Sequence, residues 1–180
     1  MKSILLTGGA RSGKSKMAQE LATKAGGQVL FVATATAGDD EMRQRIERHR
    51  KARPKDWKTL EASSNLGNKI TKNSGGVKTV IIDCITLLIS NIFEQIGENA
   101  KAAAVEKAVT AEIEELIECM KKSRANFIIV TNEVGLGIVP GDPVSRLYRD
   151  LLGKANQMLA THVDEVYLLV AGIAIPVKKA

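Results

Sequence analysis

A glycine-rich segment near the start of the chain constrains the fold more than any other feature. Residues Gly8–Ser15 read GGARSGKS, which fits the phosphate-loop pattern GxxxxGK[ST]. The segment follows the apolar run Ile4–Leu6, typical of a short buried strand, and precedes residues 17–22, whose apolar side chains recur at helical spacing. This order of strand, glycine turn and helix predicts a nucleotide-binding protein. The alternative is a turn that only joins a strand to a helix.

The backbone of such a loop explains its chemistry. Glycines let successive N–H groups turn inward around a phosphate, and the helix that follows presents the positive end of its dipole to the same anion. We expect Lys14 to reach the β and γ phosphates of a nucleotide and the Ser15 hydroxyl to bind Mg²⁺. Lys14 is therefore a predicted catalytic residue, and Ser15 is a predicted metal ligand.

Length and composition predict one globular domain that spans residues 1–180. A chain of 180 residues with 44% hydrophobic and 26% charged residues is typical of such a domain. Cys84 and Cys119 lack partners at metal-ligand spacing, so we expect buried, reduced thiols rather than a zinc site or a disulfide. We expect a cytoplasmic protein, because the sequence shows neither a signal peptide nor an apolar window of transmembrane length.

The net charge of +6 indicates an anionic partner. Nucleic acid, an anionic membrane surface and phosphorylated small molecules all fit such a balance. Binding of single-stranded nucleic acid needs aromatic side chains between the basic ones, and aromatic residues make up only 3% of this chain. Together with the phosphate loop, this favours a phosphorylated small molecule and argues against nucleic acid.

Apolar runs alternate with helical patterns along the chain. The apolar runs predict strands at 28–33, 77–83, 126–131, 163–171 and 173–177. Helical spacing predicts helices at 39–52, 86–97, 101–123 and 143–161, with a short helix inside the polar stretch 63–76. The alternation predicts an α/β fold with a mostly parallel sheet flanked by helices. Gly172 suits a tight hairpin and Pro176 suits an edge, so we expect an antiparallel edge strand.

Polar residues end two of the predicted strands. Asp83 follows an apolar run and is a candidate Mg²⁺ ligand of the Walker B type. The alternative role, an N-cap of the next helix, is compatible with the first. Asn132 and Glu133 follow another strand and point to the same edge, where open α/β sheets bind ligands. The glycine-rich, partly apolar segment 134–143 then suits a substrate-binding loop, with an ordinary surface connection as the alternative.

His49 belongs to a predicted helix that is acidic at its start, basic at its end and stops before Pro54. It shares the apolar face of this helix with Met42 and Ile46. A histidine on such a face is commonly a packed residue. The neighbouring cations favour a second interpretation, in which they attract a triphosphate to a nucleophilic imidazole. A solvated basic face is the alternative for these cations, which are Arg45, Arg48, Arg50, Lys51 and Arg53.

Four ordered motifs carry a resemblance that covers nearly the whole chain. They are GGARSGKS, the helix DDEMxxRIxxHxxxRP, DCIT after a strand, and TNEVGxGIVP. In these motifs the chain resembles the bifunctional adenosylcobinamide kinase and adenosylcobinamide-phosphate guanylyltransferase family of cobalamin biosynthesis. The resemblance implies a RecA-like P-loop enzyme that phosphorylates adenosylcobinamide with ATP or GTP. It then transfers GMP from GTP to adenosylcobinamide phosphate, with loss of pyrophosphate, through a guanylyl-histidine that aligns with His49.

The resemblance also implies the set of residues that contact the nucleotide. Family members are known with two adjacent histidines on the helix, whereas this chain has Arg48 beside His49. The choice of the histidine that carries the guanylyl group is therefore narrowed to His49. A homotrimer and a Mg²⁺ cofactor are implied as well, with Ser15 and Asp83 as metal ligands. The implied nucleotide-binding residues are Gly8, Gly9, Ala10, Arg11, Ser12, Gly13, Lys14, Ser15, Thr34, Ala35, Thr36, Arg50, Lys51, Ala52, Arg53, Glu61 and Asp83.

Two other functions compete with this interpretation. A one-step P-loop kinase would use the phosphate loop and leave His49 a structural residue. A non-catalytic nucleotide switch would bind a macromolecule through the basic helix. The sequence leaves open the kinase donor, the corrinoid-binding residues and the general base, for which Asp83 and Glu133 are candidates.

Overall fold

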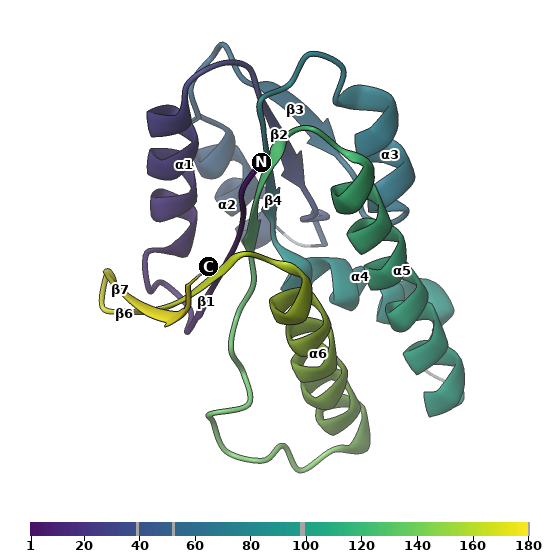
Figure 1. Ribbon diagram of the computed structural model, residues 1–180. Helices are drawn as coiled ribbons and strands as arrows, with labels where there is room; N and C mark the ends of the chain where they lie inside the picture. The colour runs from purple at the N-terminus through teal and green to yellow at the C-terminus, as the bar shows by residue number, and fades with distance from the viewer. Residues whose placement is uncertain (39, 52, 98–99, 180) are drawn as a thin grey trace.

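The computed structural model describes residues 1–38, 40–51, 53–97 and 100–179, in which strands and helices alternate along most of the chain (Figure 1). The strands are β1 (Ser3–Gly8), β2 (Val29–Ala33), β3 (Lys58–Glu61), β4 (Thr79–Asp83), β5 (Asn126–Val130), β6 (Glu165–Val170) and β7 (Ile173–Lys178). The helices are α1 (Lys14–Ala25), α2 (Asp40–Lys51), α3 (Leu66–Asn73), α4 (Ile85–Ile96), α5 (Ala102–Lys122) and α6 (Pro143–His162).

The described strands form one sheet in the order β3-β2-β4-β5-β1-β6-β7. All neighbouring pairs are parallel except β6 and β7, which form an antiparallel hairpin at one edge. The turn of this hairpin holds Ala171 and Gly172, both with positive φ. The predicted α/β fold, its mostly parallel sheet and its antiparallel edge strand are therefore confirmed.

Side chains that alternate along the strands build a core on each face of the sheet. Along β1, Leu5 belongs to one core cluster, whereas Ile4 and Leu6 belong to the other. The larger cluster packs the sheet against α3, α4, α5 and α6, and the smaller one packs it against α1. Because both faces are covered, the middle residues of the central strands are apolar, and in β2 all five residues are buried.

Most predicted elements agree with the structure to within two residues at either end. The helix predicted at 39–52 spans Asp40–Lys51, and its predicted terminal residues 39 and 52 lie outside the described part of the chain. Cys84 and Cys119 are buried free thiols, as predicted. Strand β3 was not predicted, because it is a four-residue edge strand with a mostly exposed pattern that lacks an apolar run.

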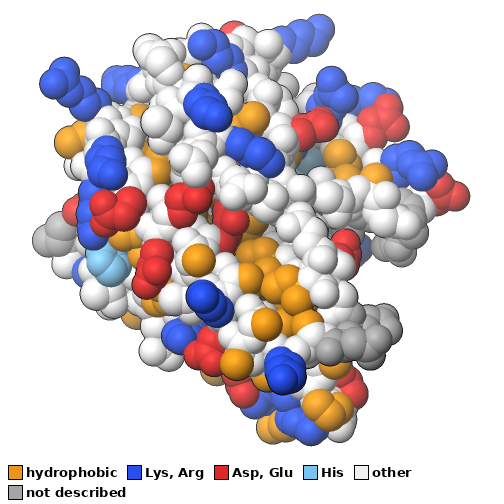
Figure 2. All heavy atoms as spheres, turned by 90° about the vertical axis from the view of Figure 1, so that its right-hand side faces the viewer, with side chains coloured by type: hydrophobic (Ala, Val, Ile, Leu, Met, Phe, Trp, Pro, Cys, Tyr) orange, Lys and Arg blue, Asp and Glu red, His pale blue; other side chains and the backbone are white. Residues whose placement is uncertain are grey.

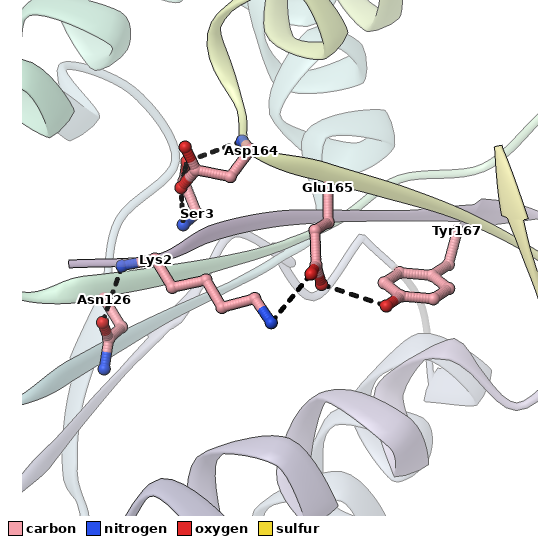
Figure 3. A network of polar contacts seen from close by, with 6 residues as sticks. All are labelled: Lys2, Ser3, Asn126, Asp164, Glu165 and Tyr167. Carbon is pink, nitrogen blue, oxygen red and sulfur yellow. Dashed lines mark hydrogen bonds and ion pairs between the residues drawn. The ribbon is translucent and has the colours of Figure 1, made fainter. Parts of the chain in front are cut away.

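A polar network fastens β1 to its neighbours at the amino edge of the sheet (Figure 3). The carboxylate of Asp164 accepts hydrogen bonds from the backbone N–H and the hydroxyl of Ser3, at 2.7 and 2.8 Å, and these bonds lower the pKa of Asp164. Glu165 contacts the Lys2 ammonium at 2.8 Å and accepts a hydrogen bond from Tyr167 at 3.0 Å. The network fixes the register of β1, whose opposite end carries the phosphate loop.

No helix within the described ranges combines the length and apolar character that crossing a membrane requires.

Candidate active site

The phosphate loop connects β1, which ends at Gly8, to α1, which begins at Lys14. Gly8 has a φ of 140°, and a Cβ built on it would collide with the carbonyl oxygen of Leu169. Gly13 precedes the helix with a φ of 99°. Both positions require the freedom of glycine, because a larger residue would be strained there or blocked by the neighbouring strand. The pattern of glycines in the sequence is thus explained by the backbone.

Lys14 is buried and turns its ammonium into the curve of the loop. Its Nζ donates hydrogen bonds to the carbonyl oxygens of Gly8 at 3.0 Å and Gly9 at 2.6 Å, and it lies 3.3 Å from the Ser12 hydroxyl. Only 6% of the residue is exposed. A cation held inside the loop is positioned to neutralise phosphate oxygens bound there.

Two distant segments brace the phosphate loop. The backbone N–H of Glu133, just after β5, donates to the carbonyl oxygen of Gly8 at 3.1 Å. On the other side, the N–H of Gly172, in the β6–β7 turn, donates to the carbonyl oxygen of Ser12 at 3.0 Å. The loop is therefore preorganised by segments more than 100 positions away in the sequence.

A cavity of about 350 Å³ opens at the carboxyl edge of the sheet beside this loop. The loop supplies one wall, and α2, β4 and β5 supply the others. Its position agrees with the general rule that ligands of open α/β sheets bind outside the carboxyl ends of the strands. Its lining residues are Ala10, Arg11, Ser12, Gly13, Lys14, Ser15, Lys16, His49, Asp83, Cys84, Val130 and Asn132.

A second, smaller cavity of about 80 Å³ shares four lining residues with the first. The shared residues are Ser15, His49, Asp83 and Cys84. Ile46 also lines the smaller cavity, so the face of α2 that carries Ile46 and His49 is the one turned toward the sheet. His49 thus lies between the phosphate loop and the ends of β2 and β4, although 34 positions separate it from Ser15 in the chain.

Arg53 forms another wall of the smaller cavity. Its guanidinium carbon lies 3.8 Å from the centroid of the Phe31 ring, a cation–π contact. Burial lowers the pKa of Arg53, and the negative charges of Asp83 and Glu61 oppose that shift. Within the described part of the chain, its buried Nε has no hydrogen-bond partner. Arg53 therefore brings a guanidinium group to the wall of the cavity beside His49.

The ends of β2 and β4 are held together by hydrogen bonds around Thr34. The Thr34 hydroxyl donates to the carbonyl oxygen of Cys84 and accepts from the N–H of the same residue, both at 2.7 Å. The backbone N–H of Thr34 donates to the carbonyl oxygen of Asp83 at 3.2 Å. Burial raises the pKa of the Cys84 thiol to about 11, so this residue shapes the wall rather than acting as a thiolate near neutral pH.

Asn91 extends the same network from α4, and sequence reasoning missed it. Its Nδ2 donates to the carbonyl oxygens of Thr34 at 2.8 Å and Ser63 at 3.3 Å, while its Oδ1 accepts from the Thr36 hydroxyl at 3.0 Å. The side chain is only 4% exposed. The signal in the sequence was the amide of Asn91 in the middle of the largely apolar helix ITLLISNIFEQI, because a buried amide requires hydrogen-bond partners.

Replacing Asn91 by Asp is expected to weaken nucleotide binding. The Asn91→Asp change places a carboxylate oxygen against two carbonyl oxygens, so the segment Thr34–Thr36 should shift. We expect the dissociation constant for GTP, measured by fluorescence titration, to rise roughly tenfold, which corresponds to about one buried hydrogen bond. Asn73→Asp, on the exposed face of α3, is the control and should leave binding unchanged. A less stable Asn91→Asp protein with unchanged GTP affinity would mean that the network serves folding alone.

The predicted nucleotide contacts divide into two groups. The residues from Ala10 to Ser15, together with Ala35, Arg53 and Asp83, line one or both cavities, as does the predicted catalytic residue His49. The others do not appear among the lining residues, and Ala52 lies outside the described part of the chain. Thr34 is buried beneath the wall, and Lys51 pairs with Glu47 at 3.0 Å on the outer side of α2. The remaining residues without a place in the lining are Gly8, Gly9, Thr36, Arg50 and Glu61.

The fold and the loop together define a P-loop α/β protein whose cavity holds a histidine beside the loop. Residues 4–177 match the CobU family model, described as cobinamide kinase / cobinamide phosphate guanyltransferase, and the chain belongs to this family.

Curated relatives cover almost the whole chain. It is 42% identical over 180 residues to the "Bifunctional adenosylcobalamin biosynthesis protein CobU" of Salmonella typhimurium, and 41% identical over 180 residues to the Escherichia coli protein of the same name. Each of these alignments spans 97% of this chain and 99% of the relative. The Pseudomonas aeruginosa "Bifunctional adenosylcobalamin biosynthesis protein CobP" is 37% identical over 174 residues, which span 97% of this chain and 96% of that protein.

Proposed function

We propose that this protein carries out two successive reactions of cobalamin biosynthesis. The first phosphorylates the hydroxyl group of adenosylcobinamide with ATP or GTP. The second transfers GMP from GTP to the resulting adenosylcobinamide phosphate and yields adenosylcobinamide-GDP and pyrophosphate. The observation that carries the proposal is the position of His49, which lines the same cavity as Lys14, Ser15 and Asp83.

In the kinase step, the phosphate loop holds the triphosphate and the hydroxyl of the acceptor attacks the γ-phosphorus. The bond between the γ-phosphorus and the β–γ bridging oxygen breaks, and a nucleoside diphosphate leaves. Lys14 and the N-terminal end of α1 offset the negative charge that develops on the transferred group. Asp83 and Glu133 are the candidate bases for the proton of the hydroxyl, since Asp83 ends β4 at the cavity and Glu133 directly follows the lining residue Asn132.

In the transfer step, a ring nitrogen of His49 attacks the α-phosphorus of GTP. A nitrogen–phosphorus bond forms, pyrophosphate leaves, and the imidazole releases its proton. A phosphate oxygen of adenosylcobinamide phosphate then attacks the same phosphorus, which breaks the nitrogen–phosphorus bond and restores the histidine. Arg53, which lines the cavity beside His49, offers a donor to the bound nucleotide.

The residues at the cavity fit a magnesium ion. Mg²⁺ in nucleotide sites is commonly bound by one or two protein oxygens, with phosphates and water supplying the rest. The Ser15 hydroxyl and the Asp83 carboxylate both line the cavity and supply such oxygens. The ion would neutralise the charge of the phosphates there.

The remaining implied properties belong to the same proposal. We assign Thr34, Ala35, Thr36, Arg50, Lys51, Ala52, Arg53 and Glu61 to the binding of the guanine nucleotide, in keeping with the family resemblance. Of these, Ala35 and Arg53 line the smaller cavity, which supports a nucleoside pocket on that side. We also propose a homotrimer as the working assembly.

Incubation with GTP that carries a radioactive α-phosphate tests the proposed function. We expect about one label per chain, stable in alkali and lost in acid, as a phosphoramidate requires. Adenosylcobinamide phosphate should then remove the label and carry it into adenosylcobinamide-GDP. GTP labelled at the γ-phosphate is the control and should leave the protein unlabelled.

Two outcomes would contradict this function. Phosphorylation of adenosylcobinamide without any α-label on the protein would indicate a one-step kinase. Slow GTP hydrolysis that does not depend on corrinoid, together with salt-sensitive binding of a macromolecule, would indicate a nucleotide switch.

A further inference from the structure

The loop between β5 and α6 exposes several large apolar side chains. Leu136 is 84% exposed, Ile138 95% and Val139 61%, and Val144 at the start of α6 is 54% exposed. The segment 134–141 reads VGLGIVPG and contains no charged residue. Apolar groups gathered in one exposed segment commonly mark a surface that binds something.

Hydrogen bonds hold this loop at both ends, and the chain makes a turn at residues 135–136 between them. At its start, the N–H of Gly135 donates to the carboxylate of Glu133 at 2.6 Å. At its end, the Arg146 guanidinium donates to the carbonyl oxygens of Pro140 at 3.0 Å and Gly141 at 2.6 Å. Asp142 caps α6 by accepting from the N–H of Ser145 at 2.8 Å. The apolar side chains are therefore presented by a braced loop.

The loop starts at the phosphate cavity. Asn132 lines that cavity, and the next residue, Glu133, donates its N–H to the carbonyl oxygen of Gly8 in the phosphate loop. Leu136 follows Asn132 by four residues, so their Cα atoms are at most about 14 Å apart. From β5 the chain descends to the lowest part of the molecule in Figure 1 before α6 begins. Figure 2, which is turned about the vertical axis, also shows apolar side chains in the lowest part of the molecule.

We propose that Leu136, Ile138 and Val139 bind the corrin ring of the acceptor, with its reacting hydroxyl or phosphate placed in the cavity at Asn132. This proposal rests on the proposed function and names the part of the site that receives the corrinoid. A corrin ring has broad apolar faces and a rim of amide groups. The apolar side chains match the faces, and the glycine-rich backbone of the loop offers N–H and C=O groups to the rim.

The continuity of the loop with the cavity favours this occupant over a second copy of the chain. The acceptor must bring a small reactive group to the phosphate loop while its bulk stays outside, and the loop that carries the apolar side chains leaves the cavity wall at Asn132. A protein partner seated permanently on these residues would occupy the surface next to the cavity that the bulk of the acceptor needs. A substrate that leaves after each turnover does not.

The double variant Leu136→Ser/Ile138→Ser tests the proposal. We expect the KM for adenosylcobinamide in the phosphorylation reaction to rise at least tenfold while kcat changes by less than about threefold, because only acceptor binding is weakened. Labelling of the variant by α-labelled GTP should match that of the parent protein. This labelling separates the proposed function from the proposed role of the loop. Absence of the label in the parent protein would contradict the proposed function, whereas the KM values of parent and variant would still test whether the loop binds the acceptor.

The double variant Ile175→Ser/Val177→Ser is the matched control. These residues are 47% and 65% exposed and lie on the edge strand β7, away from the loop. The control should leave the KM for adenosylcobinamide unchanged. An unchanged KM in the loop variant would overturn the proposal. A change in its assembled mass, measured by light scattering, would also overturn it, because a second copy of the chain would then be what covers the loop.

Discussion

Replacing His49 by Ala is expected to abolish the guanylyl transfer and spare much of the kinase reaction. The imidazole is the only side chain of the cavity that we assign to the covalent intermediate, so its loss should lower transfer by roughly a thousandfold or more, as for other covalent nucleophiles. Phosphorylation of adenosylcobinamide should fall by less than about tenfold, because His49 takes no bond-making part in it. The measurement is the yield of adenosylcobinamide-GDP and of adenosylcobinamide phosphate in parallel reactions.

His162→Ala is the matched control for this variant. The chain contains two histidines, and His162 is the other one. It ends α6 and lines a separate cavity at the amino edge of the sheet, where its Nδ1 lies 2.8 Å from the carbonyl oxygen of Met158. Both reactions should proceed normally in His162→Ala. A His49→Ala protein that still acquires a full guanylyl label would contradict the assignment.

Replacing Lys14 by Ala should impair both reactions. The side chain brings a full positive charge into the curve of the loop, where the Lys14 ammonium is buried, whereas Arg11, another cation of the loop, is exposed. Removing such a group commonly lowers kcat by 10²- to 10³-fold, or about 3 to 4 kcal/mol of transition-state stabilisation. We expect phosphorylation of adenosylcobinamide and labelling of His49 both to fall by at least about a hundredfold. Initial rates with saturating ATP or GTP measure the effect.

Lys24→Ala is the control for the loss of one positive charge from α1. Lys24 is exposed in the last turn of α1 and contributes the same charge to the same helix at the end far from the loop. Its removal should leave both rates unchanged. Because Lys14 also bonds the carbonyl oxygens of Gly8 and Gly9, circular dichroism must show that Lys14→Ala remains folded. A folded Lys14→Ala protein with normal kinase activity would refute the predicted role of the phosphate loop.

Local sequence patterns sufficed to predict most of the fold. Continuous apolar runs identify β2, β4 and β5, since strands covered on both faces need no polar alternation. The glycine pattern around Lys14 identifies the connection from β1 to α1. Strand β3 was not predicted because an exposed edge strand is stabilised by pairing with β2 rather than by its own apolar content.

The arrangement of the candidate site depends on contacts that no local pattern reports. The sequence suggested His49 by its helix face and its charged neighbours, but only the tertiary position of α2 brings it to the same cavities as Ser15 and Asp83. Asn91 was missed for the related reason that its partners, Thr34 and Ser63, come from other segments. Side chains that meet from distant parts of a chain are determined by tertiary structure, which periodicity does not encode.

The bracing of the phosphate loop has a consequence for the order in which this protein can assemble. Strand β1 is made first, yet both of its neighbours in the sheet, β5 and β6, lie in the last third of the chain. The bond from Gly172 to Ser12 forms only when the C-terminal hairpin is in place. Because synthesis proceeds from the N-terminus, the nucleotide loop is translated early and reaches its braced form late. A nascent chain therefore carries the phosphate-binding sequence long before it has a rigid phosphate-binding site.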